Sequence, residues 1–154
     1  MLRMSKLTDY SLVLLTHLAQ SGAPGLRTAH ELADCSRIPL PTVAKILKEL
    51  SRAGIVSSQR GRRGGYGLAR PPDQISVAAV LEALEGPVAL TECVASAGSC
   101  SLEPICLARD HWRPINEAIQ RTLEGLPLSA LGPRPVPLVR LHSQSLPQLD
   151  GAAT

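Results

Sequence analysis

Three cysteines in the second half of the chain are the residues best suited to chemistry. Cys93, Cys100 and Cys106 lie within fourteen residues of one another, and the fourth cysteine, Cys35, stands far from them in sequence. An odd group of thiols makes a poor disulfide framework, whereas reduced thiols bind metals well. The pattern therefore predicts a metal site on the segment 87–106, and we expect Cys35 to be a small buried core residue.

The spacing of the three cysteines distinguishes between metals. Six residues separate the first pair and five separate the second, whereas zinc sites usually contain cysteine pairs about two to four residues apart. Iron–sulfur clusters accept cysteines at more varied spacings. We therefore expect an iron–sulfur cluster, either 2Fe–2S or 4Fe–4S, with Cys93, Cys100 and Cys106 as ligands.

Three thiolates leave one coordination position of such a cluster to a different ligand. Asp110 and His111 are near in sequence, but His111 lies five residues beyond Cys106, which is about 140° round an ideal helix. Asp9 is a further candidate, although the first turn of a helix favours an acidic side chain on electrostatic grounds alone. The residues by themselves leave these ligands open, together with water, a thiol or another group.

Charge is distributed unevenly along the chain. Residues 1–70 contain eleven Lys and Arg against four Asp and Glu, a net charge of +7, and residues 71–154 contain five against nine, a net of −4. A basic half of this kind predicts binding to a polyanion such as DNA. Aromatic residues make up only 2% of the chain, which counts against a stacking platform for single strands or RNA.

The elements expected over residues 1–86 occur in the order of a winged helix-turn-helix DNA-binding domain. Apolar periodicity, a Thr28–Glu31 capping box and proline and glycine boundaries predict helices over 5–21, 28–35, 41–52 and 76–86. A strand that ends near Arg60, a glycine-rich turn and a return strand at 66–68 predict a hairpin after the third helix. In this fold the third helix enters the major groove, and the hairpin, or wing, reaches phosphates or the minor groove.

Polar and basic side chains fall where such a domain would touch double-stranded DNA. They lie at the start of the second helix, on the polar face of the third helix and in the hairpin turn. The residues predicted to contact DNA are Thr28, Thr42, Lys45, Lys48, Arg60, Arg62 and Arg63.

The sequence after residue 86 predicts three further segments. We expect residues 87–106 to be an irregular cluster-binding loop and residues 107–131 to contain a long dimerisation helix and an end segment. That helix would begin near Ile105, with a kink or a later start because of Pro114. Residues 132–154 are proline-rich and are expected to be disordered or loosely docked. The fold class is thus mainly α with a small β-hairpin wing.

Several motifs, taken together over about residues 1–131, resemble the Rrf-two family of bacterial winged-helix transcription regulators. Many members of that family are iron–sulfur proteins, and the N-terminal Leu-Thr-Asp-Tyr run resembles in particular the regulators of the SUF iron–sulfur assembly operon. The motifs are Lys6–Leu12, Glu31–Ala33, Leu47–Leu50, Gly54–Val56 and Arg60–Leu68, followed by the three cysteines.

The resemblance implies a homodimeric repressor that binds operator DNA, senses cluster status and controls SUF genes. Some family members use a histidine three residues after the last cysteine as the fourth ligand, but this position is Arg109 here. Members with a similar N-terminus use an acidic residue of the first helix of the partner subunit, and Asp9 matches that place.

Two other functions remain open from the sequence. One is a nitric-oxide-sensing iron–sulfur repressor of the same family, and the other is a zinc-stabilised protein-interaction module that does not bind DNA. No constellation typical of an enzyme is present, and we expect no small-molecule substrate. Apolar runs are too short for a membrane span, so we expect a cytoplasmic protein with no membrane partner.

Overall fold

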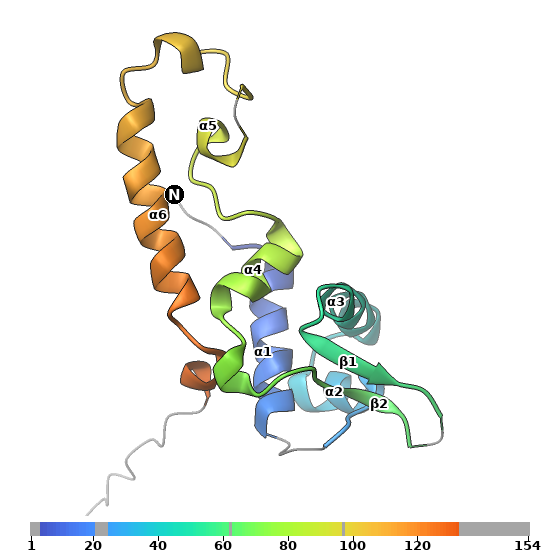
Figure 1. Ribbon diagram of the computed structural model, residues 1–154. Coiled ribbons are helices and arrows are strands. Elements are labelled where there is room, and N and C mark those ends of the chain that lie inside the picture. Colours follow the sequence, from blue (N-terminus) through green and yellow to red (C-terminus); the bar gives the residue numbers. More distant parts are fainter. Residues whose placement is uncertain (1–3, 21–24, 62, 97, 133–154) are drawn as a thin grey trace, which may run out of the picture.

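The computed structural model describes residues 4–20, 25–61, 63–96 and 98–132 (Figure 1). Arg62 of the predicted DNA contacts and nearly all of the proline-rich tail, 133–154, lie outside the described residues. The helices are α1 (Lys6–Gln20), α2 (Ala29–Ser36), α3 (Leu40–Arg52), α4 (Val77–Glu85), α5 (Glu92–Ala95) and α6 (Arg109–Glu124). The strands are β1 (Val56–Gln59) and β2 (Gly65–Leu68), and the 3₁₀ turns are η1 (Pro72–Gln74), η2 (Glu103–Ile105) and η3 (Leu128–Leu131).

A winged helix-turn-helix domain forms the larger part of the molecule. Helices α1 to α4 and the β1–β2 hairpin enclose a core that is almost entirely aliphatic, as the scarcity of aromatic residues requires. The apolar side chains with the least exposure are Leu14, Leu15, Leu32, Val43, Ile46, Leu47, Leu50, Ile55, Ile75, Val80 and Leu128. The structure thus confirms a mainly helical fold with a small hairpin. None of the described helices is long and apolar enough to cross a membrane.

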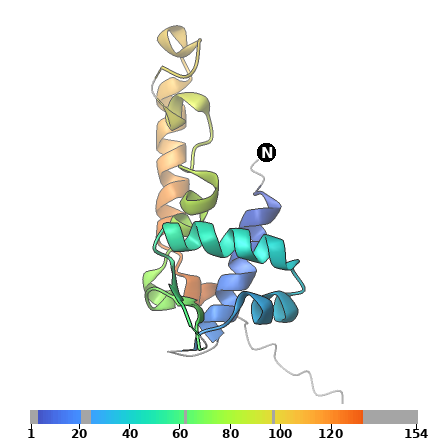
Figure 2. The same ribbon diagram turned by 90° about the vertical axis from the view of Figure 1, so that its right-hand side faces the viewer.

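An arm extends from this domain, and we define it as α5, η2 and α6 with the segments that join them. Figures 1 and 2 show α6 running away from the domain, with α5 beside it and η2 at the far end. The base of α6 is anchored because the Val77 N–H donates to the Leu126 carbonyl at 2.9 Å and the Leu128 N–H donates to the Ile75 carbonyl at 2.7 Å. The arm therefore projects from a fixed base.

The structure decides between two expectations for α6 and contradicts one for Cys35. Helix α6 has the later start, at Arg109, and Pro114 lies inside it; the start is later than Ile105 because Ile105 belongs to η2 and Cys106 is extended, with φ −79° and ψ 111°. Cys35 is exposed rather than buried. It lies in the last turn of the short helix α2, on the side that faces solvent, and its thiol reaches the Leu32 carbonyl at 3.4 Å.

A carboxylate at the end of α4 holds the start of α1. Glu85 Oε1 accepts a hydrogen bond from the Ser5 N–H at 3.0 Å and another from the Thr8 hydroxyl. These bonds, first that of Thr8 and then those of Ser5, hold the pKa of Glu85 below its usual value. A carboxylate at a helix N-terminus accepts hydrogen bonds from free N–H groups and interacts favourably with the helix dipole. Glu85 therefore links the end of α4 to the start of α1.

Replacing Glu85 with Gln is expected to lower the melting temperature at pH 7 by about 2–4 °C, a modest loss because solvent screens this exposed group. A carboxylate whose pKa is depressed by folding stabilises above its unfolded pKa of about 4.3, and this stabilisation is lost as pH falls through the folded pKa. The difference from the wild type should therefore shrink towards pH 3 in thermal unfolding measurements. Glu82→Gln, which changes an exposed carboxylate of the same helix, is the control. Equal melting temperatures for Glu85→Gln and the wild type at pH 7 would refute a stabilising role for the Glu85 hydrogen bonds.

Candidate nucleic-acid interface and thiol segment

Helix α3 presents a polar face opposite the one it buries. Its buried residues, Val43, Ile46, Leu47 and Leu50, recur at helical spacing, as the sequence predicts. Lys45 and Lys48 are consequently exposed and Thr42 is half-buried. The helix has proline at its start, where a missing N–H costs nothing.

Helix α2 supports α3 and begins at a complete capping box. The Thr28 hydroxyl oxygen accepts from the Glu31 N–H at 3.2 Å, and Glu31 Oε2 accepts from the Thr28 N–H at 2.6 Å. The Thr28 backbone bond is the main reason that the pKa of Glu31 lies below its usual value. Thr28 therefore has a structural role as the cap, and its contact with DNA stays a prediction.

The wing is anchored by a segment that sequence reasoning missed. Strands β1 and β2 pair antiparallel, with Val56 opposite Leu68. The Arg27 N–H donates to the Tyr66 carbonyl at 2.9 Å, and the Tyr66 N–H donates to the Arg27 carbonyl at 2.8 Å. The backbone of Arg27 also lies against Gly65. A Cβ at position 65 would lie 2.9 Å from the Arg27 carbonyl oxygen, so there is no room for a side chain.

Gly65→Ala is expected to displace the wing and to destabilise the fold by about 1–3 kcal/mol, because an overpacked methyl group must move backbone rather than a flexible side chain. Chemical denaturation measures the loss, and affinity for operator DNA should fall in parallel. The exposed substitution Ser58→Ala on β1 is the control. An unchanged unfolding midpoint for Gly65→Ala would contradict this account of the wing.

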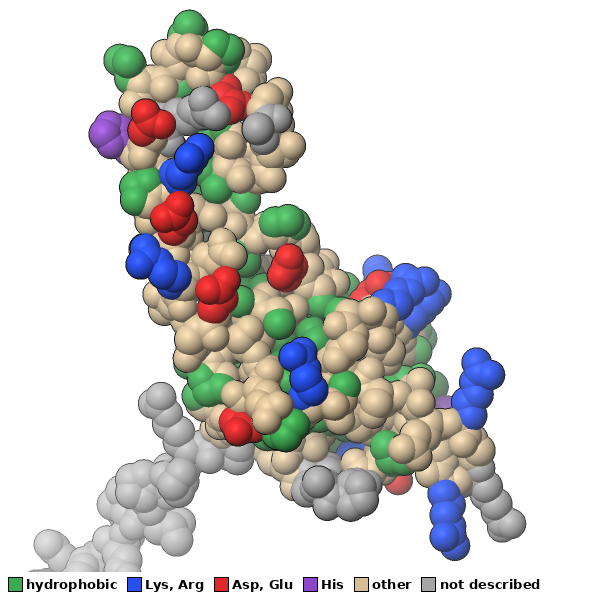
Figure 3. Space-filling view, viewed as in Figure 1, with side chains coloured by type: hydrophobic (Ala, Val, Ile, Leu, Met, Phe, Trp, Pro, Cys, Tyr) green, Lys and Arg blue, Asp and Glu red, His purple; other side chains and the backbone are tan. Residues whose placement is uncertain are grey.

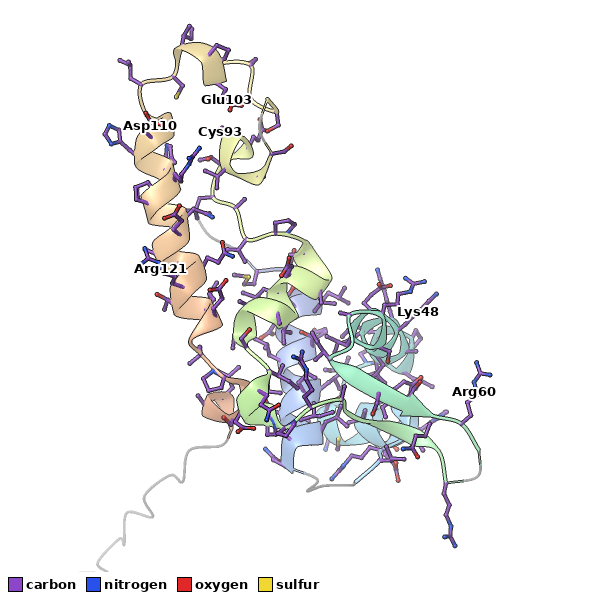
Figure 4. All side chains as sticks on the ribbon, viewed as in Figure 1. Lys48, Arg60, Cys93, Glu103, Asp110 and Arg121 are labelled. Carbon is purple, nitrogen blue, oxygen red and sulfur yellow. The ribbon has the colours of Figure 1, made fainter. Side chains whose placement is uncertain are left out.

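We use the term basic surface for Lys45, Lys48, Arg60 and Arg63, which are all exposed. Figure 3 shows Lys and Arg side chains over α3 and the wing, and a mixture of acidic and basic side chains along the arm. Figure 4 shows that Lys48 and Arg60 project on the side of the domain away from the arm. Arg52, at the end of α3, pairs instead with Glu49 at 3.1 Å. Exposed positive charge is thus gathered over α3 and the wing, whereas α6 of the arm carries side chains of both signs.

The thiol segment, residues 87–106, carries the three clustered cysteines. All three are free thiols of intermediate exposure, and Cys93 Sγ lies 3.3 Å from the Thr91 hydroxyl oxygen. Within the described part of the chain, no group of three His, Cys, Asp or Glu side chains is close enough together to hold a metal ion. The donor set fits an iron–sulfur cluster chemically, but the folded chain does not by itself gather it.

Two buried polar residues organise this segment, and sequence reasoning missed both. Asn116 of α6 is only 5% exposed; its amide oxygen accepts from the Leu90 N–H at 3.0 Å, and its amide nitrogen donates to the Val88 carbonyl at 3.0 Å. Glu103 is 9% exposed, and its Oε2 accepts from the Gly98 N–H at 2.6 Å. For Asn116, the only signal available in the sequence was a polar residue among the apolar positions of α6. For Glu103 we find no such signal.

The candidate fourth ligands lie on other elements. Asp9 is exposed in the first turn of α1, a helix of the winged domain, whereas η2 lies at the far end of the arm (Figure 1). Asp110 and His111 are exposed at the start of α6. The structure therefore brings none of them into a ligand group with the thiols of the same chain.

Comparison with known proteins agrees with this architecture. The model of the Rrf2 family, described as iron-dependent transcriptional regulators, matches residues 4–133. The HTH-type transcriptional regulator NsrR of Halalkalibacterium halodurans is 30% identical over 131 residues, which cover 84% of this chain and 90% of that protein.

Two solved structures share the fold. CymR, the global cysteine regulator of B. subtilis, aligns with a TM-score of 0.67 and 27% identity over 85% of this chain and 96% of that one. IscR of T. potens aligns with a TM-score of 0.64 and 25% identity over 84% and 85%. Because the family model spans both the winged domain and the arm, the chain belongs to the Rrf2 family and is a DNA-binding transcription regulator rather than an enzyme.

Proposed function

We propose that this regulator is a homodimeric repressor that senses iron–sulfur cluster status and controls SUF assembly genes. The observation that carries the proposal is the confinement of three free thiols to one segment, 87–106, on an arm that also presents an exposed apolar helix face. When bound, a cluster would supply iron and redox chemistry at this segment. Cys93, Cys100 and Cys106 would hold it, and the basic surface would bind the operator.

Helix α6 supports the homodimer. Its apolar positions recur at intervals of three and four residues, from Trp112 and Ile115, which are 38% and 45% exposed, to Ile119 and Leu123, which are half-buried. A stripe of this kind is the seam by which two helices pack in water. A second copy of the same helix is complementary to it, so we propose that α6 pairs with its counterpart.

The surroundings of Asp9 support its role as a ligand to the cluster of the partner subunit. Val13 lies one turn beyond Asp9 on α1 and is also exposed, at 38%. At the far end of the arm, Leu102, Ile105 and Leu107 are 60%, 77% and 94% exposed. Exposed apolar side chains around both places would be covered if the arm of one subunit packed against α1 of the other.

An oxygen ligand from the partner would link the cluster to the dimer. A carboxylate binds iron less firmly than a thiolate, so this ligand could leave when the cluster is lost or modified. Its departure would change the placement of the two winged domains and therefore their fit to two operator half-sites.

Anaerobic native mass spectrometry of the wild type beside Asp9→Ala tests the proposal, because it reports cluster type, dimer state and fourth ligand together. We expect a cluster-bearing dimer for the wild type and weaker cluster retention for the variant, and operator affinity that changes when the cluster is removed. A protein that contains zinc or no iron after anaerobic purification would overturn the proposal. A response to nitric oxide without a response to iron limitation would assign a different signal.

A further inference from the structure

Exposure along the end of the thiol segment repeats every three residues. Glu103 is buried and Cys100 and Cys106 are half-buried, whereas every residue between them is exposed. The exposed residues are Ser101, Leu102, Pro104 and Ile105. One carboxylate and two thiols thus share the inner side of this stretch.

The 3₁₀ geometry of η2 explains the repeat. The Glu103 N–H donates to the Cys100 carbonyl at 3.1 Å, and the Ile105 N–H donates to the Leu102 carbonyl at 3.1 Å. A 3₁₀ turn has about three residues per turn, so residues three apart lie above one another. Cys100 and Glu103 therefore lie above one another for a backbone reason, and Cys106 is the extended residue that directly follows the turn.

The carboxylate of Glu103 closes a loop around Cys100. Its Oε2 accepts from the N–H of Gly98, a residue whose φ of +79° suits glycine. The Ser99 hydroxyl oxygen lies 2.6 Å from the Glu92 carbonyl and 2.7 Å from the Ser96 carbonyl, so its single proton is shared between two acceptors at α5, the element that carries Cys93. Figure 4 shows Glu103 on the side of η2 that faces Cys93 and α5.

We propose that Glu103 is a positioning residue that folds the thiol segment before any cluster binds. A buried carboxylate is costly unless it is hydrogen-bonded, so the Glu103–Gly98 bond selects the loop conformation that satisfies it. In that conformation Cys100 and Cys106 are half-buried, whereas the residues between them other than Glu103 are exposed. What the thiols then hold rests on the proposed function, but the folding of the loop does not.

Alkylation of the iron-free, full-length protein measures this folding directly, with peptide mass spectrometry to follow each thiol. Cys35, which is exposed and lies outside the arm, is the internal reference. In Glu103→Ala we expect the rates at Cys100 and Cys106 to rise about tenfold relative to Cys35, the size expected for loss of one charge-assisted hydrogen bond. Glu103→Gln keeps an acceptor oxygen and should change these rates less than about threefold. Glu92→Ala, which removes an exposed carboxylate of the same segment, should leave them unchanged.

Equal rates at Cys100 in the wild type and Glu103→Ala would overturn the positioning role. Reconstitution with iron and sulfide under anaerobic conditions, followed by absorbance, separates this failure from failure of the proposed function. A wild type that never loads a cluster overturns the proposed function alone. If Glu103→Gln alkylates like the wild type but loads as poorly as Glu103→Ala, the carboxylate is also a ligand to iron, and the assignment of Glu103 to positioning alone is overturned.

Discussion

Lys45→Ala is expected to weaken binding to the cognate operator by about tenfold or more and to reduce discrimination between operators. Lys45 is exposed in the second turn of α3, within the N-terminal half of the helix, and it is the N-terminal part of a recognition helix that reaches base edges. One good base contact contributes about 1–3 kcal/mol of discrimination. Fluorescence anisotropy with the operator and single-base variants measures both effects, and unchanged discrimination would remove Lys45 from the set of base-reading residues.

Substitutions in the wing should affect DNA binding differently from substitutions in α3. In the double variant Arg60→Ala/Arg63→Ala, binding should weaken for every sequence, and the dependence of affinity on salt should become shallower by about one unit of log–log slope for each phosphate that is no longer neutralised. Arg121→Ala removes one positive charge from α6, on the arm (Figure 4), and should leave affinity and slope unchanged. A wing variant with the slope of the wild type would contradict phosphate binding by the wing.

Mixing two defective variants should restore a cluster if Asp9 completes the site of the partner subunit. Asp9→Ala retains all three thiols and lacks the carboxylate, whereas Cys106→Ala retains the carboxylate and lacks a thiol. In a mixed dimer one of the two sites would regain three thiols and an Asp9, and the other would remain incomplete. We expect poor cluster retention in each parent dimer and about half of the wild-type iron in isolated mixed dimers carrying two different affinity tags.

The same experiment has a clear contrary outcome. If Asp9 acted within its own chain, or had no role as a ligand, the mixed dimer would retain no more iron than the average of its parents. A mixed dimer of Cys106→Ala with Cys93→Ala is the matched control, because neither of its chains has a complete set of thiols. Exchange of subunits must be complete, which native mass spectrometry reports as the share of mixed dimers.

Local patterns predicted much of the winged domain correctly. The buried face of α3, the Thr28–Glu31 box and the glycine-rich hairpin are all confirmed. Each of these is set by a relation between residues a few positions apart: helical periodicity, reciprocal capping or a tight turn. Such relations operate within one element, so the sequence alone contains the necessary information.

Features that depend on contact between distant segments were not predictable in the same way. Glu85 lies 80 residues from Ser5, and Asn116 lies 26 residues from Leu90; no spacing rule connects either pair. Cys35 illustrates the same limit, because a place on a helix does not determine whether another element will cover it.

By itself, the sequence determined that this protein has a basic winged domain, an acidic remainder and three thiols on one segment, since composition and short-range spacing are properties of the chain. The tertiary structure alone decided which groups meet. It showed that Glu103 bonds Gly98 within the thiol segment, that Asn116 joins this segment to α6, that Glu85 joins α4 to α1, and that Asp9 lies apart from the thiols of its own chain. The physical reason is that burial and hydrogen bonding between distant segments are settled only when the whole chain packs.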